Sequence, residues 1–369
     1  MSRFIVELAT PADEAELRRI LAAGPTPGAI SVAFLREPNY FGDPASAGEF
    51  RQVIVIRDND NGSIAGMGCR SIRLCSVNGR WMPVGYLSNL RLLPPVRGQG
   101  LLARGYEFLR ELHADGRTAF YLSTIAADNQ AAIAALTVHR AGLPAYHFAG
   151  QYVTTVLPLG RSQRQPASGV QIRPAGPDDM PDVLRVLTAS GPGRQFFPCY
   201  QASDFGPDAR TFLNLRSEDI FLAFRRQQLV GLLAAWDQYA FRQNVVHSYH
   251  GPLRALRPLY NAWAGLTGRP RLPQPGQPLR SLVAALPVVA DDDPRTAAAL
   301  LDAAMDARRG QGWDYLLVGL HESDPLLRAL HARRGRRYVT NLYVVCWPDG
   351  ESLHRWLDAR PPYLELGTL

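Results

Sequence analysis

The feature that most constrains this chain is a junction between an apolar run and an amphipathic helix, with a glycine-containing turn between them. Residues 84–93 are mostly apolar and predict a strand, two prolines follow, and residues 97–100 read Arg-Gly-Gln-Gly. Residues 101–112 have helical spacing. The first N–H groups of a helix lack partners within it, and the helix dipole makes that end positive. Because glycines let the backbone approach a ligand closely, the junction predicts a site for a phosphate or another anion.

The length of the chain predicts two domains. At 369 residues it exceeds what one hydrophobic core usually supports. With 46% apolar and 20% charged residues, its composition is that of a globular protein. Residues 1–21 alternate charged and apolar positions, and no stretch has the length of a membrane span. We therefore expect a cytoplasmic protein with no membrane partner.

The charged residues favour small anionic ligands. The chain has 40 basic and 33 acidic residues, a net charge of +7, and every basic residue is arginine. These arginines are spread along the chain, which is typical of a protein that binds a small anion rather than nucleic acid. The four cysteines and eight histidines show no metal-ligand spacing, so we expect reduced structural thiols and no metal.

Two halves of the chain repeat one plan. Residues 160–169 are polar, contain Pro and Gly, and predict a linker. A short alternating strand, a Pro/Asp helix start and an amphipathic helix occur at both 4–21 and 170–187. This matching order predicts a duplicated domain, one copy in residues 1–159 and the other in residues 170–369. The second copy also carries an insertion and a C-terminal tail.

The order of elements in the first half points to a known fold. Hairpin turns are predicted at Asn61-Gly62 and Asn78-Gly79, because both central positions of a type I′ turn need a positive φ. Three antiparallel strands and then two strand–helix units, with the glycine turn between them, resemble the GCN5-related N-acetyltransferases. The resemblance implies an α+β fold of two tandem acetyltransferase-fold domains, each a mixed, mostly antiparallel sheet flanked by helices. It also implies an acyl-coenzyme A as substrate, acetyl-coenzyme A before others.

The glycine turn resembles the pyrophosphate loop of that family, whose motif is Arg/Gln-x-x-Gly-x-Gly/Ala. Arg97 and Gly100 match the first and fourth positions, whereas Leu102 stands where the family has Gly or Ala, and Ala103 follows one residue late. The alternative is a degenerate loop that binds nothing. The resemblance implies that the coenzyme A pyrophosphate contacts Arg97, Gly98, Gln99, Gly100, Leu101, Leu102 and Ala103.

Three further residues are expected beside the same ligand. By resemblance, backbone groups of Arg91 and Leu92 pair with the pantetheine arm as an added strand would. Asn129 matches the family's Asn that commonly contacts this arm, and an Asn at this point is also a good helix N-cap. Both interpretations of Asn129 stay open.

The sequence names no catalytic acid or base. The family's usual Tyr would lie one helical turn before Gly142, where this chain has Val138. His139 is adjacent but is expected at the surface, Tyr146 lies past the turn, and Ser88 could order a water molecule. The strand before the loop carries neither Asp nor Glu. We therefore expect catalysis by positioning, with water carrying the proton.

The corresponding junction in the second half is acidic. Its strand, residues 281–289, runs into Asp291, Asp292 and Asp293 without a glycine. A helix dipole contributes about 0.3–1 kcal/mol, too little to offset three like charges beside a pyrophosphate. We predict that this half has lost coenzyme A binding and forms a wall of the acceptor site.

The insertion, residues 239–277, is rich in aromatic residues, Pro, Gly and Arg. Long insertions in compact domains commonly form lids or binding loops. We predict a lid over the acceptor site, with Tyr249 and His250 as candidate acceptor contacts. Packing against the first half is the alternative.

Together these observations predict an acyl-coenzyme A-dependent N-acyltransferase that acts through its first half. The acceptor is expected to be a primary amine of a small molecule or peptide, and the protein a monomer or homodimer. Two alternatives stay open. One is a transferase for longer acyl or aminoacyl groups, and the other is a non-catalytic protein that senses acyl-coenzyme A or holds a partner.

Overall fold

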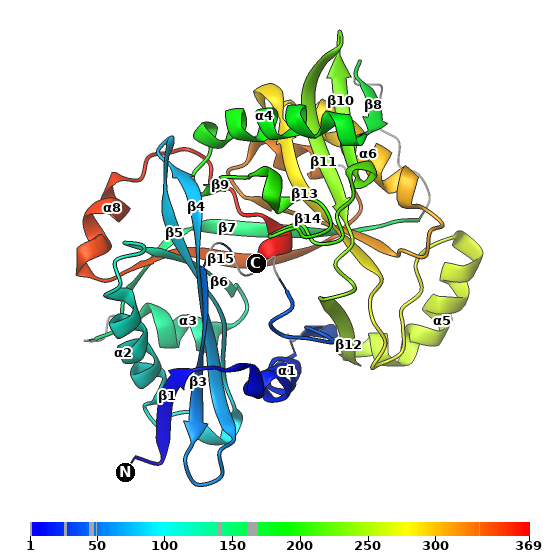
Figure 1. Cartoon of the computed structure of the whole chain (residues 1–369). Helices are drawn as coiled ribbons and strands as arrows, with labels where there is room; N and C mark the ends of the chain where they lie inside the picture. Colours follow the sequence, from blue (N-terminus) through cyan, green and yellow to red (C-terminus); the bar gives the residue numbers. More distant parts are fainter. Residues whose placement is uncertain are drawn as a thin grey trace.

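One mixed sheet runs through both halves of the chain (Figure 1). The computed structural model describes residues 2–25, 28–43, 48, 50–138, 142–160, 169–331 and 333–369. Within these residues the strand order is β1-β3-β4-β5-β6-β15-β7-β14-β13-β11-β10-β8, and β9 (Phe197–Pro198) pairs with β4. A separate ribbon pairs β2 (Ile30–Leu35) with β12 (Gln243–Tyr249). The sheet is therefore the frame on which any site must be built.

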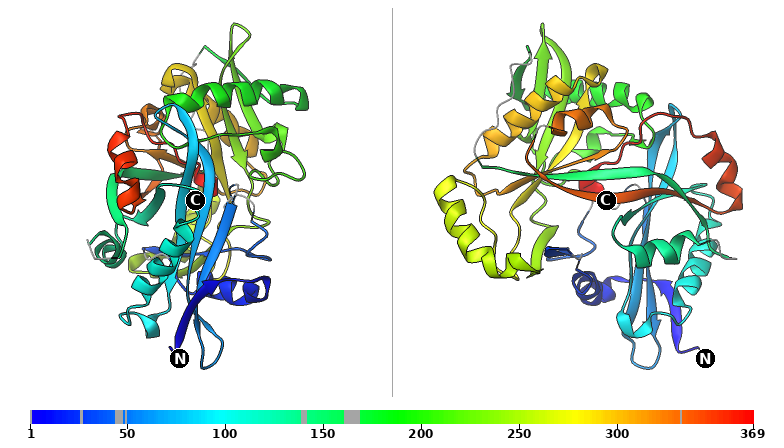
Figure 2. Two further views of the ribbon diagram at one scale, coloured as in Figure 1. Left: turned by 60° about the vertical axis from the view of Figure 1, so that its left-hand side comes forward. Right: turned by 180° about the vertical axis from the view of Figure 1, so that it is seen from behind.

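The first half forms one side of this sheet and covers both of its faces. α1 (Glu14–Ala22) lies on one face, and α2 (Leu101–His113) and α3 (Gln130–Thr137) lie on the other (Figure 2, left). The strands, in sheet order, are β1 (Phe4–Leu8), β3 (Phe50–Asp58), β4 (Ile64–Val77), β5 (Arg80–Leu92) and β6 (Tyr121–Ala126).

The alternation along β3 explains why the sheet needs helices on both faces. Val53 and Val55 belong to the buried cluster under α1, whereas Ile54 and Ile56 belong to clusters on the α2 face. Successive side chains of a strand point to opposite faces, so an apolar run without polar alternation must be covered twice. Burial of both faces makes this strand the centre of the first half.

The second half repeats this arrangement. α4 (Met180–Ser190) covers one face of its strands, and α6 (Pro294–Arg308) with α7 (Arg328–His331) covers the other. Its strands, from the outer edge inwards, are β8 (Gln171–Pro174), β10 (Ile220–Arg225), β11 (Gln228–Trp236), β13 (Ser281–Val289) and β14 (Tyr315–His321).

The last strands of the two halves exchange places at the centre of the sheet. β15 (Arg336–Cys346), from the second half, pairs with β6 of the first half and with β7. β7 (Ala145–Pro158), from the first half, pairs with β14 of the second half. Each half thus completes its sheet with a strand from the other. Residues 161–168 of the predicted linker lie outside the described part of the chain, and the division into residues 1–159, 160–169 and 170–369 stays a prediction.

Local sequence signals agree with the structure at one hairpin and differ at another. Asn78 and Gly79 have φ values of 50° and 78°, as the predicted type I′ turn requires. At Asn61-Gly62 only Gly62 has a positive φ, because β3 and β4 are joined by a longer loop. Between α1 and β3 lies the strand β2, which pairs with β12 of the second half.

Candidate functional site

The strands β5 and β6 are parallel neighbours over only part of their length. Gly85, Tyr86 and Leu87 pair with Tyr121, Leu122 and Ser123, and Ser123 Oγ donates to Leu87 O at 3.2 Å. Beyond this row β5 stays beside β4, while β6 follows β15. The two strands therefore diverge, and the β6-facing edge of β5 after Leu87 has no strand partner among the described residues.

A bulge in β5 marks the start of this divergence. Ser88 pairs with Cys69 and Arg91 pairs with Met67, so two residues of β5 face one of β4. Asn89, inside the bulge, has a φ of 54°. A bulge bends its strand and interrupts pairing. Here the bulge lies between the last row paired with β6 and the residues Arg91 and Leu92.

The glycine turn follows directly. Gly98 and Gly100 have φ values of 78° and 73°, and a Cβ built on either would meet no atom within 4 Å. Gly100 is the residue before α2, whose first turn carries no acidic side chain. The glycines are thus required by backbone conformation rather than by crowding, and the space beside both of them is open. The first N–H groups of α2 have no partner within the helix.

The side chains of the loop leave that space clear. Arg97 Nε donates to Leu92 O at 3.0 Å, and Gln99 Nε2 donates to Pro95 O at 3.1 Å, while both side chains remain exposed. Leu101 is buried, and Leu102 packs against the core under α2. Since Leu102 points inward, its branched side chain does not occupy the phosphate side of the loop. Ala103 is exposed on the first turn of the helix.

Two other predicted contacts have visible structural roles. Asn129 Oδ1 accepts a hydrogen bond from Ala132 N at 3.2 Å and so caps α3. The Arg91 side chain lies against Gly24, and its Nε is buried without a hydrogen-bond partner among the described residues. Burial lowers the pKa of this guanidinium. Contacts of Asn129, Arg91 and Leu92 with a cofactor stay predictions.

The three weak catalytic candidates lie in different surroundings. Ser88 is half-buried in the bulge of β5. Tyr146 is packed behind the strand pair, where its hydroxyl shares a hydrogen bond of 2.5 Å with Tyr106 and burial raises its pKa to about 12. His139 lies outside the described residues. Ser88 therefore lies on β5 at the start of the divergence, and Tyr146 contacts Ser123 of β6 in the last paired row.

Tyr86, which the sequence reasoning missed, lies at the point of divergence. Its hydroxyl shares a hydrogen bond of 2.8 Å with Thr124 Oγ1 of β6, and burial raises its pKa to about 12. A small pocket of about 60 Å³ between the two halves is lined by Tyr86, Leu122 and the C-terminal segment, by which we mean residues 363–369. The sequence does place Tyr86 two residues before Ser88, and alternation along a strand puts both side chains on the same face.

The second half contains the same backbone geometry. Parallel pairing of β13 with β14 ends at Ala284 and Val318, and a bulge follows at Leu286, whose φ is 55°. The C-terminal segment fills the space that results. Glu365 is buried there, and its Oε2 accepts hydrogen bonds from Leu286 N at 2.9 Å and from the Tyr363 hydroxyl at 2.8 Å. The short helix η10 (Leu366–Thr368) lies against β13 and β14.

The acidic turn of the second half supplies hydrogen-bond acceptors to the start of the helix that follows it, α6. Asp293 is the N-cap of α6, with Oδ1 accepting from Arg295 N at 3.1 Å and Oδ2 accepting from Thr296 Oγ1 at 2.7 Å. Asp292 forms an ion pair with Arg194. The positive end of this helix is therefore already neutralised by a carboxylate of the chain itself.

The insertion bridges the two halves. β12 pairs with β2, and α5 (Pro252–Thr267) follows at the periphery (Figure 1). Tyr249 is buried and its hydroxyl donates to Pro273 O at 2.8 Å, whereas His250 is exposed and contacts Ser248. Pairing with β2 agrees with the alternative, in which the insertion packs against the first half, and the lid over the acceptor site stays a prediction. The roles of Tyr249 and His250 in acceptor binding stay predictions.

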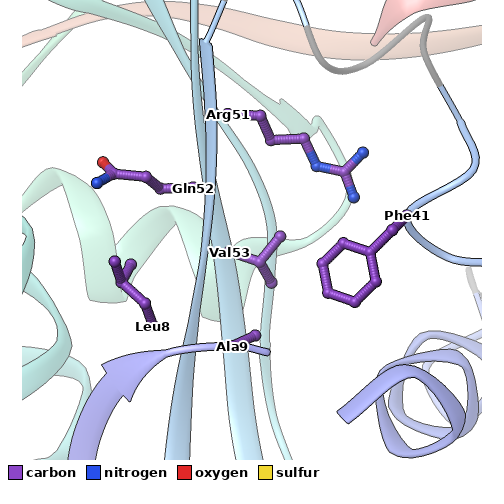
Figure 3. Close-up of a pocket in the computed structure, with 6 residues that line it drawn as sticks. All are labelled: Leu8, Ala9, Phe41, Arg51, Gln52 and Val53. Carbon is purple, nitrogen blue, oxygen red and sulfur yellow. The ribbon is translucent and has the colours of Figure 1, made fainter. Parts of the chain in front are cut away.

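A pocket of about 300 Å³ lies away from the glycine loop, at the edge of β3 that β1 leaves uncovered (Figure 3). Arg51, Val53 and Phe41 lie on one side of β3, and Leu8 and Gln52 lie on the other. Two strands, β3 and β4, separate this edge from β5. We therefore do not include it in the candidate acyl-coenzyme A site.

Comparison with known proteins assigns the fold. No family model and no curated protein matches the chain. Among solved structures, N-myristoyltransferase of Saccharomyces cerevisiae with bound myristoyl-CoA matches 94% of this chain and 83% of its own, with a TM-score of 0.58 and 11% identity. A GCN5-related N-acetyltransferase from Sphaerobacter thermophilus matches 100% and 99%, with a TM-score of 0.56 and 14% identity. One from Anabaena variabilis matches 93% and 72%, with a TM-score of 0.51 and 13% identity.

These matches extend over both halves of the chain. The fold is therefore that of the GCN5-related N-acetyltransferases in a two-domain form, as the order of elements in the sequence predicts. At this level of identity the likeness carries over the fold and not the activity. No helix of the described residues is both long and apolar enough to cross a membrane.

Proposed function

We propose that this protein is an N-acyltransferase that moves an acyl group from coenzyme A to a primary amine of a small molecule or peptide. Acetyl is the first acyl group to test, and the first half is the active one. The observation that carries the proposal is a diverging strand pair that leads into an open glycine turn without acidic residues at the start of α2. The four cysteines are scattered along the sequence without the spacing of a disulfide framework, and we propose the cytoplasm as the compartment.

Each part of an acyl-coenzyme A has a matching group in the first half. The N–H groups of residues 98–103 suit a pyrophosphate, with the exposed Arg97 side chain beside them. The edge of β5 that faces away from β4 at Arg91 and Leu92 has no strand partner among the described residues and suits the amides of the pantetheine arm, which would displace the Arg97 side chain from Leu92 O. A ligand in this position would have its thioester near Tyr86 and Thr124, where β5 and β6 separate.

The chemistry needs a proton donor and a route for a second proton. The amine nitrogen attacks the thioester carbon, the carbon–sulfur bond breaks, and the thiolate leaves. Tyr86 is a neutral phenol because burial raises its pKa to about 12, so it can donate to the developing charge on oxygen or sulfur. Ser88 can hold the water that accepts the amine proton. In this proposal the acceptor enters between the two halves, beside Tyr86.

Transfer of a longer acyl group is the second candidate. It is favoured by the match to N-myristoyltransferase with bound myristoyl-CoA over 94% of this chain. A longer chain would need apolar room beyond the thioester, so acetyl-, octanoyl- and myristoyl-coenzyme A should be compared in one assay. The preferred acyl length is then the one with the highest kcat/KM. Binding without release of coenzyme A for any amine would favour the non-catalytic alternative.

The decisive experiment changes the loop. Gly100→Asp adds a side chain and a negative charge where the pyrophosphate is proposed to bind, and should weaken acetyl-coenzyme A binding at least tenfold, about 1.4 kcal/mol. Gly116→Asp is the matched control, because Gly116 has a similar φ of 66° and equally open surroundings at the other end of α2. Calorimetry should find one site per chain in the wild type. An unchanged affinity for acetyl-coenzyme A in a folded Gly100→Asp variant would contradict the proposal.

A further inference from the structure

Three potential metal ligands from distant parts of the sequence converge at one end of the central strand pair. His147 lies near the start of β7, Cys346 is the last residue of β15, and Glu351 begins α8 (Glu351–Trp356). Their donor atoms all lie within 4.8 Å of one another. His147 Nε2 donates to Glu351 Oε1 at 2.8 Å, and Cys346 Sγ donates to the same oxygen at 3.7 Å.

These separations are close to those in a tetrahedral zinc site. Zinc binds sulfur at about 2.3 Å and nitrogen or oxygen at about 2.0 Å, which gives tetrahedral edges of about 3.5 Å from sulfur to oxygen and about 3.3 Å from nitrogen to oxygen. The observed 3.7 Å and 2.8 Å differ from these edges by about half an ångström or less. The third separation, from Cys346 Sγ to the His147 nitrogen, is within 4.8 Å.

The fold holds the three ligands together. Cys346 pairs with Ala145, two residues before His147, so the two strands fix the thiol and the imidazole relative to each other. Gly350 brings α8 close: a Cβ at this position would lie 2.2 Å from Ala119 O and 2.8 Å from the Cys346 Cβ. Any side chain there would move Glu351 away from the strands. Gly350 is thus a positioning residue for the third ligand.

The charges also suit a divalent cation. A thiolate, a carboxylate and a neutral imidazole together carry two negative charges, which one Zn²⁺ neutralises. Zinc binds the thiolate form of cysteine, so the Cys346 thiol must lose its proton when the ion binds. Metal binding would release that proton to solvent. The neighbouring Asp349 already pairs with His113 at 3.0 Å and is not one of the three.

The fourth coordination position is open to water. The side chains of His147 and Glu351 are 26% and 28% exposed, so solvent reaches the cluster from one side. His354 stacks on the His147 ring with a centroid distance of 3.8 Å and an angle of 15°. Lone pairs of two parallel stacked rings do not converge on one ion, so His354 packs against a ligand rather than acting as one.

We propose that the protein binds one zinc ion through Cys346 Sγ, His147 Nε2 and the Glu351 carboxylate, with water as the fourth ligand. The site lies at the end of the β7–β15 pair and fastens α8 to it. It is separate from the proposed acyltransferase chemistry, which uses β5 and the glycine loop. No spacing in the sequence indicates it, since position 147 lies far from positions 346 and 351.

Metal content and cobalt spectroscopy test this site directly. Full-length protein purified without chelators should contain about one equivalent of zinc by elemental analysis. After exchange with Co²⁺ it should show a thiolate-to-cobalt charge-transfer band in the near ultraviolet. Cys346→Ser should abolish the band, and Glu351→Gln should weaken metal retention at least tenfold. Chelation should lower the melting temperature of the wild type.

Matched controls keep the test decisive. Cys199→Ser removes another thiol, and Asp349→Asn removes the neighbouring carboxylate, so both should retain zinc and the cobalt band. If Cys346→Ser does not fold, the cobalt spectrum of the wild type and the metal retention of Glu351→Gln still test the site. A wild-type protein without zinc and without a charge-transfer band would overturn the proposal. A band that persists in Cys346→Ser would do the same.

Discussion

The two halves of this protein begin from the same backbone geometry and end with different surroundings. In both, a parallel strand pair separates at a bulge whose central residue has a positive φ, Asn89 in one half and Leu286 in the other. In the first half the strand leads into glycines and open space. In the second it leads into aspartates, and the chain's own segment with Glu365 lies between the strands.

This difference teaches which features make such a strand pair able to take a ligand. The bulge and the divergence are common to both halves, so they cannot by themselves specify binding. What differs is the charge at the helix start and the occupancy of the gap. A polar backbone edge that no ligand covers still needs hydrogen-bond partners. In the second half Glu365 and its neighbours supply these hydrogen-bond partners. The gap between the strands is therefore filled by the chain itself and cannot take a ligand.

The largest expected effect comes from removing that internal occupant. Glu365→Ala would leave Leu286 N and the Tyr363 hydroxyl without their buried partner, and should lower the free energy of unfolding by about 3 kcal/mol. Urea titration measures the loss. Burial raises the pKa of Glu365 and so favours its neutral form, which Glu365→Gln imitates; this variant should lose less. Equal stability of Glu365→Ala and the wild type would mean that the segment is not a structural part of the second half.

A second test asks whether the first half has a proton donor as well as an open strand edge. Tyr86→Phe removes the hydroxyl that bonds Thr124, and should lower kcat about a hundredfold with little change in acyl-coenzyme A affinity. Since the pKa of Tyr86 is raised to about 12, the loss should be the same throughout the neutral pH range. Tyr146→Phe is the control, because that phenol is packed against Tyr106 behind the strands. Similar losses in both variants would argue against Tyr86 as the proton donor.

A smaller effect is expected where the insertion meets the first half. His250→Ala should raise the KM for the amine acceptor about threefold, because this exposed side chain borders the ribbon that joins the halves. The affinity for acyl-coenzyme A should not change. His247→Ala, another exposed histidine of β12, should leave both constants as they are. Loss of both affinities in His250→Ala would identify the insertion as a packing element.

The smallest effect should follow a change in the acidic turn. Asp292→Gly removes a carboxylate at a residue with a φ of 52° and breaks its ion pair with Arg194. Acyl-coenzyme A binding should stay at one site per chain, because the gap beside β13 is filled by the chain itself. Calorimetry of this variant beside Gly100→Asp compares the two turns directly. A second binding site in Asp292→Gly would show that charge alone had closed the second half.

Local signals in the sequence predict the local elements well. The junction before α2, the turn at Asn78-Gly79 and the duplicated order of elements each depend on neighbours along the chain, and each is present in the structure. The inward direction of Leu102 follows from its place on an apolar helix face. These features need no knowledge of distant contacts.

Features built from distant residues could not be read in the same way. Alternation identifies β7 and β15 as strands but not their partners, so their exchange between the halves was not predicted. Glu365 looks like an ordinary acidic residue until its bond to Leu286 is seen. The cluster of His147, Cys346 and Glu351 has no spacing that a motif could capture. Each of these features depends on contacts between residues that are far apart in the sequence, which a local sequence pattern does not show.

The exchange of final strands also has a consequence for how the chain matures during synthesis. β6, which forms one wall of the proposed acyl site, acquires its other neighbour only when β15, more than two hundred residues further along the sequence, has been made. Until then it is an exposed edge, which is the kind of surface that pairs with the wrong partner. The first half therefore cannot mature ahead of the second. The proposed activity would therefore depend on residues 336–346, which lie far from β6 in the sequence.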